Sequence, residues 1–148
     1  MIAYLVDIAG HGLQAGILMG FTGLRLCEDG RVFFALAAAS PPLLQWHASR
    51  ATLSNMEEQQ FPLGLLPVAG FDGHTLQAKA GDLLVVATDG ILEVANKPGE
   101  EFGVERLKEV IASNSTVALP DLAQKILSGA SDFGAQFDDQ TILLVRCL

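Results

Sequence analysis

Residues 81–96 read "GDLLVVATDGILEVAN", and the interpretation of the fold starts from this stretch. The run "LLVVAT" is apolar and of strand length, and Asp89 and Gly90 follow it directly. A short apolar run bounded by turn residues predicts a buried strand. A carboxylate at the end of such a strand either closes a turn or takes part in chemistry, and neighbouring parts of the chain help to decide which.

Two other apolar stretches also carry aspartate at one end. Asp7 follows "AYLV", whereas Asp138 and Asp139 precede "TILLV". In an antiparallel sheet these ends can lie at one edge, which would bring three carboxylates to one point. Carboxylates gathered beside a dry core repel one another and lose hydration, and a hard divalent cation relieves both effects. Oxygen ligands favour Mg²⁺ or Mn²⁺ over zinc, so the pattern is consistent with a metal site.

The plain alternative is that each aspartate is an ordinary turn residue. Asp-Gly pairs are common in turns, because aspartate bonds its own backbone and glycine adopts conformations that other residues avoid. The three positions taken together favour a metal site more than any one of them does. The residue pattern alone leaves both interpretations open.

A cofactor site is a second, remote alternative. Residues 10–15, Gly-His-Gly-Leu-Gln-Ala, match the dinucleotide fingerprint G-x-G-x-x-A between a predicted strand, "IAYLVD", and a predicted helix, "GLQAGILMG". That motif belongs to a unit whose next strand is parallel to the first. Here the following segment predicts a hairpin, and no acidic strand end follows at the right place for the ribose.

The remaining elements are short strands followed by two amphipathic helices. Residues 22–37 predict a hairpin with Asp29-Gly30 as its turn, and "PPLLQWHA", "RATLSN" and the segment before Ala80-Gly81-Asp82 predict further strands. Apolar residues recur at helical spacing in "GVERLKEVIAS" and "LPDLAQKILSGAS". This order predicts an α+β fold, a mainly antiparallel sheet with helices on its outer face, as a single domain over residues 1–148.

Composition and charge restrict the class of protein. The formal charge is −8, from 17 acidic and nine basic residues, which argues against nucleic acid or an anionic membrane as partner. No apolar stretch approaches the ~18 residues that a membrane-spanning helix needs. With only two cysteines and no recognisable signal peptide, we expect a cytoplasmic protein.

Five motifs then point to a family. "DIAGHGLQAGILMG" resembles the Asp-x-Ser-Gly-His-Gly-x-x-Ala signature of the stage II sporulation E/RsbU-type serine/threonine phosphatases of the PPM (PP2C-like) superfamily. "FPLGLLP", "GDLLVVATDGILEVAN", "FGVERL" and "DDQTILLVR" resemble, in the same order, that family's later motifs. The resemblance extends over nearly the whole chain.

The resemblance implies an αββα sandwich with a binuclear Mn²⁺ or Mg²⁺ centre at one end. Carried over by position, Asp7 and the backbone carbonyl of Ile8 would be metal ligands together with Asp89 and Asp138. Residues near the metals rather than bound to them would be Gly10, His11, Gly90 and Asp139. The implied reaction is attack of a metal-bound hydroxide on phosphoserine or phosphothreonine, and the implied substrate is a STAS-type anti-sigma-factor antagonist.

Three departures from the family pattern bear on activity and assembly. The family's upstream Gly-Gly-Asp strand, which supplies a further metal ligand, has no match here; the first helical region is shortened; and "AAASPPLL" replaces Ala-Gly-His-Pro-Pro. A catalytically impaired relative that acts as a binding or regulatory module is therefore the alternative to an active phosphatase. Loss of a strand and helix would expose sheet edge and apolar surface, so we also expect a homodimer or strand exchange.

Overall fold

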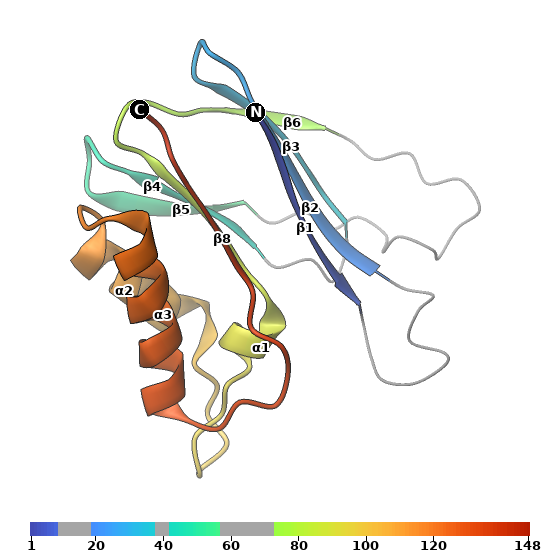
Figure 1. Ribbon diagram of the computed structural model, residues 1–148, viewed down its shortest axis with the longest axis vertical. Coiled ribbons are helices and arrows are strands. Elements are labelled where there is room, and N and C mark those ends of the chain that lie inside the picture. Colours follow the sequence, from blue (N-terminus) through green and yellow to red (C-terminus); the bar gives the residue numbers. More distant parts are fainter. Residues whose placement is uncertain (9–18, 38–41, 57–72) are drawn as a thin grey trace.

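The computed structural model describes residues 1–8, 19–37, 42–56 and 73–148, with residues 7, 8 and 19 described by their backbone alone. Two four-stranded antiparallel sheets pack face to face, with helices beyond the second sheet (Figure 1). The first sheet has the order β1 (Ile2–Ile8), β2 (Met19–Leu26), β3 (Arg31–Leu36), β6 (His74–Gln77). The second has the order β5 (Thr52–Met56), β4 (Leu43–His47), β7 (Leu83–Ala87), β8 (Ile142–Arg146).

Three helices complete the described chain: α1 (Asp89–Leu92), α2 (Gly103–Asn114) and α3 (Leu119–Phe133). The two longer helices lie against the outer face of the second sheet, and α1 follows β7 at the lower end of the sandwich (Figure 1). The C-terminal end of β1 points towards this lower end as well. No helix among the described residues is long and apolar enough to cross a membrane.

Strand β7 explains why the central stretch of the sequence is continuously apolar. It lies between β4 and β8, and all five of its residues are buried. Leu83 and Val85 face the helices, where Leu107, Ile111 and Ile126 complete one core. The alternate residues of the strand face the first sheet and form a second core, which includes Leu5, Leu24, Val32, Leu84 and Val86. A strand buried on both faces cannot show the alternation of a half-exposed one.

The α+β class, the sandwich, the strands and the two amphipathic helices are confirmed among the described residues. The helix predicted over residues 12–20 lies mostly outside them, and its last two residues, Met19 and Gly20, belong to β2 instead. In the described part of the chain, helices cover only one of the two outer faces. The remote alternative, a dinucleotide-binding unit, is wrong, because β1 and β2 are antiparallel, with Ile2 opposite Arg25 and Ile8 opposite Met19.

The outer face of the first sheet, which no described element covers, carries exposed apolar side chains beside Arg25 and Arg31. Ile2 and Tyr4 are 76% and 69% exposed, and Val6 and Phe33 also face solvent. A shallow hollow of about 290 Å³ lies over this face, between the side chains of β1, β2 and β3. Contiguous exposed apolar surface of this kind often marks an interaction site, whereas single exposed apolar residues are common on any protein.

Candidate metal centre

Thr88 joins the two aspartate-bearing segments of the second sheet. This residue connects β7 to α1 and is only 3% exposed. Its hydroxyl accepts a hydrogen bond from the Thr141 amide at 2.9 Å and donates one to the Asp139 carbonyl at 3.2 Å. The Thr88 amide in turn donates to the Thr141 carbonyl at 3.0 Å. The Thr-Asp-Gly and Asp-Asp-x-Thr motifs are therefore a single unit in space, although about 50 residues separate them.

Gly90 lets the backbones of these two segments touch. A Cβ built at this buried position would lie 2.8 Å from the Asp139 carbonyl carbon and 3.0 Å from that of Asp138, and closer still to the Asp139 oxygen. Real Cβ atoms do not approach backbone so closely, so glycine is needed here for space rather than for an unusual φ. Gln140 adds a further link, since its Nε2 donates to the Gly90 carbonyl at 3.0 Å.

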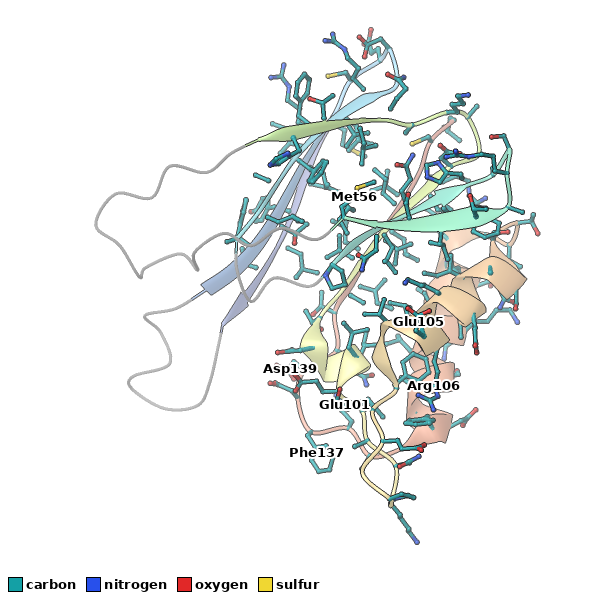
Figure 2. All side chains as sticks on the ribbon, turned by 180° about the vertical axis from the view of Figure 1, so that it is seen from behind. Met56, Glu101, Glu105, Arg106, Phe137 and Asp139 are labelled. Carbon is teal, nitrogen blue, oxygen red and sulfur yellow. The ribbon has the colours of Figure 1, made fainter. Side chains whose placement is uncertain are left out.

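Asp89, Asp138 and Asp139 are three carboxylates at this end of the sandwich. One oxygen of Asp89 accepts the Gly90 amide and one of Asp138 accepts the Asp139 amide, both at 2.7 Å. Figure 2 shows the Asp139 side chain next to α1. None of the ion pairs among the described residues involves these three side chains.

The structure describes the other predicted site residues only in part. The backbone of Asp7 lies opposite Gly20 in the β1–β2 pair, and Ile8 ends β1, whereas Gly10 and His11 lie outside the described residues. The described side chains include no group of three or more His, Cys, Asp or Glu arranged to hold a metal. The proposed ligand set, Asp89 and Asp138 included, therefore stays a prediction.

The residues that are described fit a hard divalent cation. Their donors are carboxylate oxygens and backbone carbonyls, which Mg²⁺ and Mn²⁺ prefer, and no thiol or imidazole lies among them. The hydrogen bonds of Thr88 fix the Asp89 segment relative to the Asp138–Asp139 segment. Contacts that support metal ligands generally act in this way. The end of the sandwich near α1 is thus chemically suited to Mg²⁺ or Mn²⁺.

Sequence reasoning missed two structural features of this end. It placed Asp89 at a strand end, whereas β7 ends at Ala87 and Asp89 opens the four-residue helix α1. It also gave Thr88 and Thr141 no role, although both occur in the motifs. The threonine shared by "ATDG" and "DDQT" is the signal that could have indicated their contact.

Comparisons with known proteins identify the fold. The solved SiaA PP2C domain of Pseudomonas aeruginosa superposes with a TM-score of 0.82 at 16% identity, over 99% of this chain and 75% of that one. The SpoIIE phosphatase domain of Bacillus subtilis, presoaked with Mn, superposes with a TM-score of 0.64 at 22% identity, over 86% of this chain and 55% of that one. At these identities the likeness shows the fold, which is that of PP2C-type phosphatase domains.

Sequence comparison narrows the class to a family. Protein IcfG of Synechocystis sp. is 31% identical over 137 residues, which make up 91% of this chain and 21% of that protein. The chain thus spans about a fifth of the length of this curated relative. The family model described as stage II sporulation protein E (SpoIIE) matches residues 21–148. The chain belongs to the SpoIIE family.

Proposed function

We propose that the chain is a metal-dependent protein serine/threonine phosphatase that acts on a phosphorylated regulatory protein. Membership of the SpoIIE family and the PP2C-type fold support the reaction class. The observation that carries the proposal for this chain is the pair of hydrogen bonds made by the Thr88 hydroxyl with Asp139 and Thr141, which hold Asp89 beside the Asp138–Asp139 segment.

Asp7, the Ile8 carbonyl, Asp89 and Asp138 are the residues that would hold the metals, two ions by analogy with the family. Bound Mg²⁺ or Mn²⁺ would supply an activated water nucleophile at neutral pH and neutralise charge that develops on the phosphoryl group. The soaked Bacillus subtilis structure makes Mn²⁺ the first ion to test.

The residues of this chain have defined tasks in that proposal. Asp89 and Asp138 hold cations, while Thr88 and Gly90 keep the two carboxylate-bearing backbones in contact. Without cations these carboxylates would repel a phosphate dianion that approaches them, because like charges close together are strongly unfavourable outside water. Substrate binding is therefore expected to require metal as strictly as turnover does.

For the substrate we propose a phosphorylated STAS-type anti-sigma-factor antagonist, with the reaction taking place in the cytoplasm. The family resemblance supports this class of substrate. The net charge of −8 disfavours nucleic acid and anionic membranes as competing partners. A phosphoprotein would approach the lower end of the sandwich, where Phe137 is 77% exposed directly before Asp138 (Figure 2).

The test is hydrolysis of p-nitrophenyl phosphate and of a phosphoserine peptide with Mn²⁺, Mg²⁺ or EDTA. Asp89→Asn and Asp138→Asn should abolish the metal-dependent rate, while Asp139→Asn should retain much of it. Asp132→Asn, an exposed aspartate of α3, is the matched control and should behave as the wild type. Equal rates in all four variants would refute the assignment. Metal binding without turnover would instead support the alternative, an impaired relative that serves as a binding or regulatory module.

A further inference from the structure

A polar cavity of about 330 Å³ lies at the end of the sandwich opposite α1. It is formed where the turn between β4 and β5 meets the connection from β6 to β7 (Figure 1). All of its lining residues are polar or charged: His47, Ser49, Arg50, Gln77, Lys79 and Asp82. A small cavity lined by polar and charged residues suits a small, charged occupant better than a hydrophobic one.

Asp82 holds the walls of this cavity in place through hydrogen bonds. The side chain is buried, with the residue 2% exposed, and one carboxylate oxygen accepts the Ala48 amide at 2.9 Å. The other oxygen accepts the Lys79 amide at 3.0 Å and the Gln45 side-chain amide at 3.2 Å. These bonds hold the β4–β5 turn against the β6–β7 connection, so the walls of the cavity are in place without a ligand. The carboxylate is satisfied and does not need a further cation.

The remaining charges of the cavity are positive. Arg50 and Lys79 are exposed, and neither side chain takes part in an ion pair or hydrogen bond among the described residues. They are two of only nine basic residues in a chain whose net charge is −8. Ser49 adds a hydroxyl, and His47 is held by a 2.6 Å contact between its Nε2 and the Ser54 hydroxyl. A guanidinium, an ammonium and a hydroxyl on a fixed frame are donors that suit a phosphate group.

We propose that this cavity is a phosphate-binding site, in which Arg50, Lys79 and Ser49 hold a phosphate group between the two turns. The group belongs either to free inorganic phosphate or to a phosphorylated side chain of a partner protein. The site is remote from the carboxylate end of the sandwich and needs no metal. It therefore does not rest on the proposed phosphatase activity.

The test is a titration of the isotopically labelled chain with inorganic phosphate, followed by amide NMR shifts at constant ionic strength. EDTA is present throughout, so that metals cannot bind phosphate at the other end. We expect saturable shifts for the amides of the 48–51 and 78–82 turns and none near Asp89. The double variant Arg50→Ala/Lys79→Ala should bind at least about tenfold more weakly, since each charge-assisted bond contributes of the order of that factor.

A matched control removes the same charge elsewhere. Lys97→Ala/Lys125→Ala changes two exposed lysines away from the cavity and should bind as the wild type. Circular dichroism of both double variants checks that they are folded. Absence of saturable shifts, or equal weakening in both double variants, would overturn the proposal.

The two sources of phosphate are distinguished with peptides. A phosphoserine peptide that binds more tightly than inorganic phosphate, while its unphosphorylated form does not bind, identifies a phosphoprotein as the partner. A phosphopeptide no tighter than inorganic phosphate identifies the free ion. Binding of the unphosphorylated peptide with the same affinity would contradict recognition of phosphate altogether.

Discussion

Replacing Thr88 with valine tests whether the tie between the two motifs organises the carboxylate end. Valine keeps the shape of threonine but removes the hydroxyl that accepts the Thr141 amide and donates to the Asp139 carbonyl. A hydrogen bond contributes about 1 kcal/mol net, and an amide left unpaired costs about 1–3 kcal/mol. We expect Thr88→Val to lower the free energy of unfolding by about 2 kcal/mol. For a chain of this size that corresponds to roughly 4–8 °C in Tm.

Thr88→Ser is the matched control, because serine keeps the hydroxyl and loses only a buried methyl group. Its expected loss of stability is about 1 kcal/mol, from the methyl alone. The sharper difference should appear in Mn²⁺ affinity. Loss of a contact that supports metal ligands typically weakens binding by about 10–100-fold, so valine should weaken Mn²⁺ binding at least tenfold and serine should not.

Urea denaturation and Mn²⁺ titration of the three proteins provide both quantities. The reasoning is refuted if Thr88→Val is as stable as Thr88→Ser and binds Mn²⁺ as the wild type does. It is also refuted if both variants lose Mn²⁺ binding equally, since the hydroxyl would then have no specific part in positioning the carboxylates.

Four further predictions follow from the described contacts. Gly90→Ala should destabilise the fold by about 1–3 kcal/mol in urea denaturation, because its Cβ meets the Asp139 carbonyl backbone; unchanged stability would contradict that contact. Phe137→Ala should raise KM for a phosphopeptide several-fold with Mn²⁺ affinity unchanged, and an unaltered KM would exclude this ring from substrate binding. Burial, and then the negative charge of Asp82, raises the pKa of the Cys147 thiol. In a Cys27→Ser variant, alkylation of Cys147 should therefore begin at higher pH in the folded chain than in the unfolded chain, and equal pH profiles would argue against this. The apolar outer face of the first sheet predicts a homodimer at micromolar concentration in light scattering, which Tyr4→Lys should dissociate, whereas a clean wild-type monomer would contradict it.

Local sequence patterns predicted most helices and strands, because turn residues and the spacing of apolar residues determine these elements over short stretches of chain. The Asp29-Gly30 turn occurs as expected, with Gly30 at a φ of +80° and the Asp29 carboxylate accepting bonds from Arg31, which lower the pKa of Asp29. The helical spacing of Leu107, Ile111 and Ile126 placed these residues correctly in the core. In each case the sequence pattern that makes the prediction lies within one helix or one hairpin.

The arrangement of the strands could not be predicted in the same way. The strands on either side of Gly81 read like neighbours, yet β6 belongs to the first sheet and β7 to the second. A Gly-Asp pair occurs both in hairpin turns and in connections between two sheets. The residues of the turn therefore do not tell whether the flanking strands pair with each other. The role of Asp82 was missed for the same reason, because its partners Ala48 and Gln45 lie more than 30 residues away.

The candidate site was predicted in part. The strand-end pattern identified Asp89 and Asp138, whose segments do meet, because antiparallel strands β7 and β8 bring the end of one to the start of the other. The pattern gave no account of how they are held, since the Thr88–Thr141 contact depends on register. Register is set by the whole sheet and not by either motif alone.

The central claim is that Asp89 takes part in binding a divalent cation at the α1 end. Calorimetric titration of Mn²⁺ into the wild type, Asp89→Asn and Asp132→Asn tests it directly. The account predicts saturable binding to the wild type and to Asp132→Asn, and a loss of that binding in Asp89→Asn. Identical isotherms for all three proteins, or no binding to the wild type, would contradict it.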